Sequence, residues 1–318
     1  MHRSRRQDRK LDLAARAAWL YYVAGNTQDQ IAEKLNVSRQ AAQRLISTAV
    51  SSKLIKFRLD HPLAAGMALA EALRARFDLF YCDVVPTDSA AADPTPAIAI
   101  AAAELLERLL LQEAPTVLAF STGRTLRAMA GELPQVAAPQ HKLASLIGAI
   151  TRDGRAGGFE VVMRLAERTG AQCFPMPTPV VASSPAEREL LQMQHSFQVI
   201  LELAQTAQAA FLGIGEIAWN APIHRDGFVT DQEITDLVDR GAVGELAGWA
   251  FDSHGRLIEG GTNALVAGIP LSKLKAERAI AVGGGPRKVT AIRAALRGRL
   301  VAGLITDEAT ARAVLAGG

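Results

Sequence analysis

The spacing of apolar residues near the start of the chain predicts three short helices. In the first, over residues 11–23, the apolar positions lie three or four residues apart, and Gly25-Asn26 supplies a stop. Thr27 is placed to cap a second helix over residues 28–35, and Ser38 to cap a third over residues 39–51. Two short helices joined by a tight turn are typical of a helix-turn-helix. The inward positions expected on the three helices are Leu13, Ala17, Leu20, Ala24, Ile31, Leu35, Ala42, Leu45, Ile46 and Ala49.

The start of the third helix carries outward polar side chains of the kinds that read DNA. Arg and Gln have forked donors that match the edges of guanine and adenine in the major groove. After this helix, residues 53–59 alternate polar and apolar positions, which predicts a short wing strand with a basic edge toward phosphates. The sequence therefore predicts a winged helix-turn-helix over residues 1–60. Its expected DNA-contacting residues are Ser38, Arg39, Gln40, Gln43 and Arg44.

The pattern then changes to one in which strand-like and helix-like runs alternate. A helix over residues 62–77 joins the two parts, and its apolar stripe fits a core or a dimer seam equally well. The clearest strands cover residues 81–85, 116–120, 142–147, 209–213 and 279–282. Alternation of this kind predicts a mostly parallel sheet with helices on both faces, a Rossmann-like α/β domain over residues 61–318.

Two strand ends carry turns whose residues suit a polar ligand, because open α/β sheets bind ligands where their strands end. The first turn, residues 121–125, offers hydroxyls, an Arg and backbone amides at a helix N-terminus. The other, residues 283–288, exposes backbone amides, and Lys288 can place a charge on a phosphate or carboxylate. An ordinary capped or flexible turn is the alternative interpretation of each.

Two more glycine-rich segments are predicted to be turns at the same pocket. Residues 213–218 match a dinucleotide-binding fingerprint formally, but Pro222 breaks the helix that should carry the pyrophosphate. We therefore expect no NAD and interpret Gly215 as part of a pocket-lining turn. A second small-residue turn, over residues 241–249, presents Glu245, whose carboxylate can accept hydrogen bonds from sugar hydroxyls.

Charge separates the two predicted parts. Residues 1–58 carry twelve Lys and Arg against four Asp and Glu, a net +8, and the other 260 residues carry 23 against 28, a net −5. A small basic module on a mildly acidic body indicates a nucleic-acid reader with a second function.

The remaining counts exclude several classes of protein. The 318 residues contain two cysteines, too few for a disulfide framework or a zinc cluster, and no uninterrupted run of 18 apolar residues. The basic N-terminus is not followed by an apolar segment, so no signal peptide is expected. His195 and His254 lack metal-ligand spacing. We expect a cytoplasmic protein with no metal, no cofactor and no membrane partner.

Taken in order, these motifs resemble the SorC family of bacterial sugar-binding transcriptional regulators. The matching stretches are residues 30–44, 121–126, 213–215, 241–245, 281–288 and 305–309. The resemblance implies an effector domain similar to ribose-5-phosphate isomerase and glucosamine-6-phosphate deaminase. It also implies a homo-oligomer, dimer or tetramer, whose hold on double-stranded operator DNA is altered by a sugar, polyol or sugar phosphate.

Carried over motif by motif, the resemblance makes Glu245 the pocket carboxylate and Lys288 the pocket lysine. Arg225 and Arg152 are weaker candidates for a second basic group, because the loops around them do not align. Members that read sugar phosphates often have Gly-Gly-Thr-Thr where this chain has Thr-Gly-Arg-Thr at 122–125, so a free polyol stays possible. The expected effector-binding residues are Ser121, Thr122, Gly123, Arg124, Thr125, Gly215, Arg225, Glu245, Gly284, Gly285 and Lys288.

The leading prediction is a regulator, expected to be a repressor, of a sugar or polyol catabolic operon, and not an enzyme. The alternative is a sugar-phosphate isomerase or deaminase with an accessory DNA module. That chemistry needs a general acid–base pair, and Glu245 with His224 is the pair that the sequence offers. The sequence does not tell a repressor from an activator.

Overall fold

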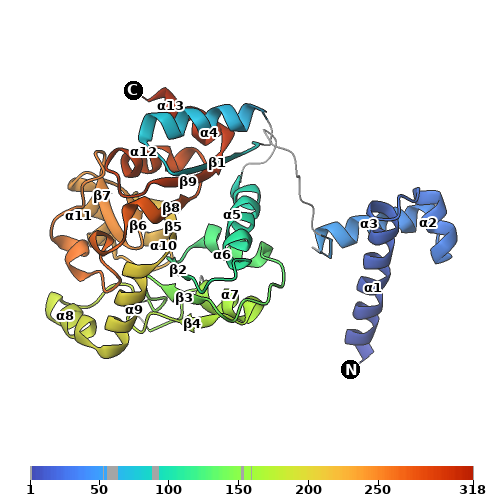
Figure 1. Cartoon of the computed structure of the whole chain (residues 1–318), viewed down its shortest axis with the longest axis horizontal. Helices are drawn as coiled ribbons and strands as arrows, with labels where there is room; N and C mark the ends of the chain where they lie inside the picture. The colour runs from blue at the N-terminus through green and yellow to red at the C-terminus, as the bar shows by residue number, and fades with distance from the viewer. Residues whose placement is uncertain are drawn as a thin grey trace. The chain divides into compact units, whose positions relative to one another are not determined.

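The computed structural model describes residues 2–52, 54–55, 64–87, 93–151, 154–158 and 160–317. The chain divides into two compact units, Met1–Pro62 and Leu63–Gly318 (Figure 1). Most of the predicted wing, residues 53 and 56–59, lies outside the described residues, and so does Arg152.

The described part of the first unit consists of three helices, α1 (His2–Tyr22), α2 (Gln28–Leu35) and α3 (Arg39–Ser51). Thr27 and Gln30 form a reciprocal capping box that begins α2. The Ser38 hydroxyl accepts a hydrogen bond from the Ala41 amide at 3.2 Å and so caps α3. Between the two helices Asn36 adopts a left-handed conformation with φ 52°, which asparagine tolerates better than most residues. These local contacts produce the predicted tight turn.

The core of the first unit confirms most of the predicted inward positions. Ala42, Leu45, Ile46 and Ala49 of α3 are buried together with Ile31 of α2. On α1 the prediction is partly wrong, because Leu13 is 38% exposed and Ala24 lies beyond the helix on the surface. The buried face consists instead of small side chains that allow α1 to pack closely on α3, namely Ala14, Ala17 and Ala18.

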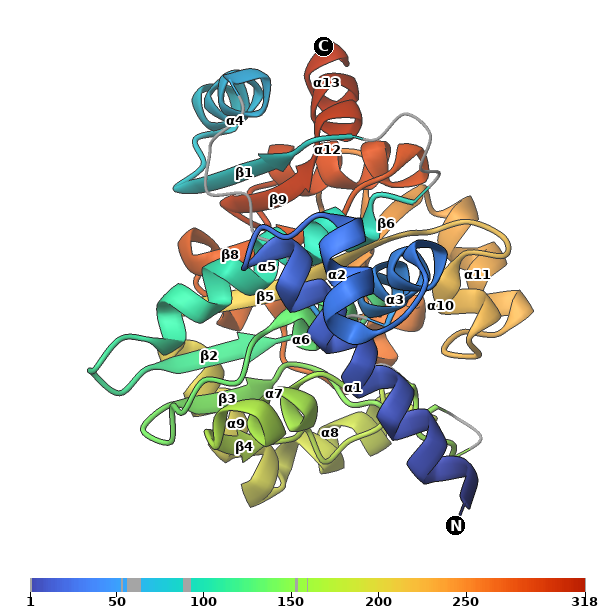
Figure 2. The ribbon, with the colours of Figure 1, turned by 90° about the vertical axis from the view of Figure 1, so that its right-hand side faces the viewer.

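The second unit has a nine-stranded sheet in its described part, with the order β1-β9-β8-β5-β2-β3-β4, as Figure 2 shows. Neighbours along this path are parallel, and β6 and β7 extend the end of β5 as an antiparallel pair. The strands are β1 (Tyr81–Val85), β2 (Val117–Phe120), β3 (Lys142–Ser145), β4 (Gln172–Phe174), β5 (Ala209–Glu216), β6 (Ala242–Leu246), β7 (Trp249–Asp252), β8 (Ala279–Val282) and β9 (Gly303–Asp307).

Helices cover both faces of the sheet (Figure 1). Alternate residues of β5 enter two different hydrophobic clusters, Phe211 with α5, α6 and α7, and Leu212 with α4, α9, α12 and α13. The parallel α/β architecture predicted from the sequence is confirmed. The helices are α4 (Ala64–Phe77), α5 (Thr95–Leu110), α6 (Arg124–Glu132), α7 (Val162–Thr169), α8 (Pro185–Met193), α9 (His195–Thr206), α10 (Pro222–Arg225), α11 (Asp231–Asp239), α12 (Val289–Arg297) and α13 (Glu308–Ala316).

Two predicted turns prove to be strands. Residues 213–216 continue β5, and the segment around Glu245 forms β6, so that Gly215 lies opposite Glu245 in the antiparallel ladder. The glycines that resembled turn residues are needed for close packing instead. A Cβ at Gly244, for example, would lie 2.7 Å from the Phe251 ring.

Candidate ligand cavity and nucleic-acid interface

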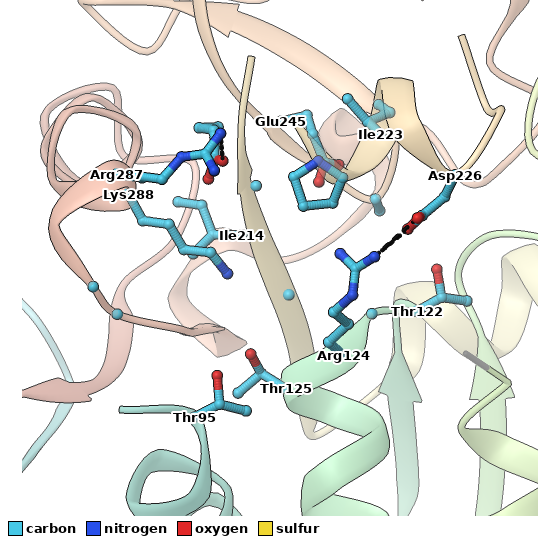
Figure 3. A pocket seen from close by; sticks show the side chains of 18 of the residues that line it. Thr95, Thr122, Arg124, Thr125, Ile214, Ile223, Asp226, Glu245, Arg287 and Lys288 are labelled. Atoms are coloured by element: carbon cyan, nitrogen blue, oxygen red, sulfur yellow. Dashed lines mark hydrogen bonds and ion pairs between the residues drawn. The ribbon is translucent and has the colours of Figure 1, made fainter. Parts of the chain in front are cut away.

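A cavity of about 410 Å³ lies at the carboxyl ends of β2, β5 and β8, which are neighbours in the sheet. Its walls come from the start of α5, the turn before α6, β5, the α10 segment, β6 and the turn before α12 (Figure 3). This is the edge at which parallel α/β sheets bind small molecules.

The structure brings nine of the eleven expected effector residues to this cavity. They are Thr122, Gly123, Arg124, Thr125, Gly215, Glu245, Gly284, Gly285 and Lys288. Ser121 does not line the cavity. Its buried hydroxyl accepts a hydrogen bond from the Gly213 amide at 2.9 Å, which connects the first turn to β5. Arg225 does not line it either, and its side chain is 60% exposed.

Glu245 is placed at the cavity wall by β6. Its Oε2 accepts a hydrogen bond from the Gly248 amide at 2.9 Å, and a Cβ at Gly215 would lie only 2.3 Å from its Oε1. Burial raises the pKa of the Glu245 carboxyl, while that hydrogen bond and the charge of Lys288 act in the opposite direction. The missing side chain at Gly215 is therefore what leaves room for the carboxylate.

Lys288 enters the cavity from the turn before α12 (Figure 3). Burial lowers the pKa of its ammonium group, and the negative charges of Glu216 and Glu245 raise it. The lysine and the two carboxylates thus form one electrostatic group, although they come from three separate segments of the chain.

Two ion pairs at the cavity involve acids that the sequence analysis did not single out. Arg124 donates from Nη2 to both oxygens of Asp226, at 2.9 and 2.7 Å. Arg287 Nη2 lies 2.9 Å from Glu216 Oε1, and the Glu216 side chain is only 10% exposed. No motif marks these acids, since Asp226 lies 102 residues from its partner. Glu216 could have been found only by recognising that β5 continues beyond Gly213.

Other cavity residues correct details of the prediction. Asp93, Pro94 and Thr95 also line the cavity, and α5 begins at Thr95. Pro222 does not simply break a helix but starts the short helix α10.

The general acid–base pair required by the enzyme alternative is not assembled. Glu245 lines the cavity, whereas His224 does not, and His224 Nε2 instead lies 2.8 Å from Asp231 Oδ1. In the part of the chain that the structure describes, no group of three or more His, Cys, Asp or Glu residues could hold a metal ion. None of the described helices combines the length and apolar character that crossing a bilayer requires.

The residues expected to contact DNA lie at the start of α3, and all five are exposed. Arg39 Nε is 3.5 Å from Asp29 Oδ1 in a pair that is 68% exposed on both sides, a geometry too solvated to hold the arginine in place. Their helix packs through the opposite face, so these polar side chains are available to a partner.

A family model described as a sugar-binding domain matches residues 61–316. The chain belongs to this SorC-type sugar-binding family. A relative in Brucella abortus (strain 2308), the erythritol catabolism regulatory protein EryD, is 33% identical over 303 residues, which cover 95% of this chain and 96% of EryD. The transcriptional regulator LsrR of Klebsiella pneumoniae subsp. pneumoniae is 32% identical over 316 residues, covering 96% and 93%.

The SorC-type fold extends along nearly the whole chain. The crystal structure of the full-length sorbitol operon regulator SorC from Klebsiella pneumoniae matches with a TM-score of 0.74 and 25% identity, covering 96% of this chain and 98% of SorC. The predicted SorC-type membership is confirmed, and so is the class of sugar-responsive transcriptional regulators.

Proposed function

We propose that the chain represses a sugar or polyol catabolic operon, and that a polyhydroxylated ligand in the cavity controls its hold on operator DNA. The observation that carries the proposal is the meeting of Arg124, Glu245 and Lys288, from three separate segments, in one cavity. Such convergent polar groups orient a small ligand. We propose no catalytic role, because the relatives are named as regulators.

The roles that we assign in the cavity follow from donor and acceptor chemistry. Glu245 accepts from ligand hydroxyls, and Lys288 donates to ligand oxygens. Thr122 and Thr125 supply hydroxyls that both donate and accept. This division suits a molecule rich in hydroxyl groups. From the resemblance of the motifs, we also propose that the domain is related to sugar-phosphate isomerases.

For DNA binding, we propose that α3 enters the major groove, where Gln40, Gln43 and Arg44 discriminate bases and the surrounding basic residues neutralise phosphates. A wing over residues 53–59 would add phosphate contacts. Reading of this kind needs two half-sites, so we propose a dimer or tetramer as the active form.

For the ligand to control operator binding, it must bind more tightly to one of two assemblies, the one that can bind DNA or the one that cannot. Within the second unit, hydrogen bonds link the cavity to α13, and the residue after α13 to α4. The Gly285 amide at the cavity donates to Thr310 Oγ1 of α13 at 2.7 Å, and Arg76 of α4 donates to the Gly317 carbonyl, just after α13, at 3.0 Å. Because α4 begins where the second unit begins, a shift of α13 would reach the connection to the first unit. Identical half-site geometry with and without ligand would contradict this coupling.

The test combines operator selection with ligand release. The full chain selects its preferred site from random-sequence DNA, and fluorescence anisotropy then gives Kd for that site and for a scrambled one. Arg44→Ala should lower the preference by about 5- to 150-fold, the value of one base contact. Arg312→Ala, a charge loss at an exposed position of α13, serves as the control and should leave the preference unchanged. Equal preference in wild type and Arg44→Ala, or no effect of any polyol, sugar or phosphate ester on Kd, would contradict the proposal.

A further inference from the structure

Two of the three cations that line the cavity, Arg124 and Arg287, are paired with carboxylates. We propose that Asp226 and Glu216 are specificity-determining residues, which make the cavity select uncharged polyhydroxylated ligands over the phosphate esters of the same compounds. This inference rests on the proposed function, in which the cavity is the effector site.

Arg124 is the cation that the first turn contributes, and its Nη2 is paired with an acid. Both oxygens of Asp226 accept hydrogen bonds from its Nη2, at 2.9 and 2.7 Å. The pair is partly shielded, with side-chain exposures of 39% and 22%. Figure 3 shows the two side chains pointing toward one another, from α6 and from the end of α10. A phosphate group at Arg124 would have to share the guanidinium with a carboxylate.

Arg287 repeats this arrangement on the other side of the cavity. Its guanidinium lies 2.9 Å from Glu216 Oε1, and Glu216 is the more buried partner, with 10% exposure against 62%. The buried member of the pair is therefore the negative one. An anion that approached Arg287 from the cavity would meet the Glu216 carboxylate.

The balance of charge around the whole cavity also favours an uncharged ligand over a phosphate ester. Its lining holds four carboxylates against three cations, a formal charge of −1 when all are ionised. Lys288, the third cation, is influenced by both Glu216 and Glu245. A phosphate ester, which carries up to two negative charges near neutral pH, would thus enter a site with no surplus positive charge.

Hydrogen-bond chemistry separates the two ligand classes as well. Ionised carboxylates only accept, so they need ligands that donate. Each hydroxyl of a polyol donates one bond and accepts others, and a phosphate dianion has no proton to donate. The cavity also presents the hydroxyls of Thr95, Thr122 and Thr125. Its acceptor-rich lining therefore matches an uncharged ligand with many hydroxyls.

The test measures Kd by isothermal titration calorimetry, with the ligand-induced rise in Tm as a second readout. The probes are erythritol, ribitol, D-sorbitol and D-ribose, each with its terminal phosphate monoester, and inorganic phosphate alone. Asp226→Asn keeps the shape of the side chain and removes its charge, and Glu216→Gln does the same at the second pair. Asp239→Asn, an exposed residue at the end of α11 outside the cavity, controls for the change in net charge.

We expect a parent compound to bind the wild-type chain at least about tenfold more tightly than its ester. Asp226→Asn should shift this ratio toward the ester by about tenfold or more, Glu216→Gln should shift it in the same direction, and Asp239→Asn should leave it within about twofold. Tighter binding of an ester than of its parent by the wild type would overturn the inference, and so would an unchanged ratio in Asp226→Asn. Binding of esters alone would still support an effector cavity, whereas no binding by any probe, with operator affinity unaffected, would overturn the proposed function and this inference with it.

Discussion

Gly215→Ala provides the sharpest test of how the cavity is built. The added Cβ would lie 2.3 Å from Glu245 Oε1 and 3.2 Å from its Cδ and Cγ, whereas ordinary contacts begin at 3.4 Å. The Glu245 carboxylate must therefore retreat by about 1 Å. Because the carboxylate is held between β5 and the Gly248 amide, this retreat stretches its 2.9 Å hydrogen bond.

The size of the effect follows from two opposing contributions. Loss of a hydrogen bond to a charged group costs about 1.5–3 kcal/mol, and crowding adds about 1–3 kcal/mol. Replacing a strand glycine returns about 0.5–1 kcal/mol through lower chain entropy in the unfolded state. We expect a net loss of about 1.5–5.5 kcal/mol, which lowers Tm by about 3–22 °C for a unit of this size.

The assay is thermal unfolding of the full chain with and without polyol, compared with Gly131→Ala. Gly131 lies in α6, and a Cβ there would meet no atom within 4 Å. That variant should be unchanged or more stable by up to about 1 kcal/mol, since alanine favours a helix. In Gly215→Ala the displaced carboxylate should also weaken ligand binding by about tenfold or more. If Gly215→Ala unfolds at the wild-type temperature and binds ligand normally, Glu245 does not pack against Gly215 and our account of the cavity wall is wrong.

Three further predictions concern other parts of the fold. Asp307→Ala should cost about 2–4 kcal/mol in urea unfolding, because the buried Asp307 caps α13 through the Thr310 amide at 3.0 Å, and a loss below about 1 kcal/mol would contradict this role. Burial raises the pKa of Cys82 to about 12 from 9.0, so its alkylation at pH 8 should be about 1000-fold slower in the native chain than in urea, and equal rates would refute its burial. The same shift means that the folded state keeps a proton that the unfolded state releases, so stability should fall as pH rises above about 9. Ser38→Ala should destabilise the first unit by about 1 kcal/mol in a thermal scan, whereas Ser47→Ala, an exposed control within α3, should not.

The features that the sequence predicted correctly are those fixed by neighbouring residues. The bounds of α2 and α3 match the prediction because Thr27 and Ser38 cap these helices with their own side chains. The turn before α6 and the turn before α12 were found for the same reason, since hydroxyls, glycines and a lysine adjacent in sequence act together. The α1 start at His2 was missed, because the polar residues before Leu11 show no apolar period.

What the sequence could not show depends on pairing between distant segments. The continuation of β5 and the existence of β6 follow from their antiparallel register, in which Gly215 faces Glu245. A glycine-rich stretch predicts a turn when it is considered alone and a strand when its partner is known. The same holds for Asp226, which looks like a surface acid until α6 places Arg124 beside it.

This dependence on distant partners bears directly on ligand choice. A turn such as that of residues 122–125, with its hydroxyls, amides and arginine, predicts an anion site when judged by its own residues. In the folded chain Asp226 forms an ion pair with Arg124, and Glu216 forms one with Arg287. Acids from distant segments therefore offset the positive charge that would favour a phosphate. Two chains with the same first turn could therefore respond to different ligands if they differed only at the position of Asp226. A single substitution of the acid that pairs with the arginine can therefore change the selectivity between an uncharged ligand and its phosphate ester, while the sequence of the first turn stays the same.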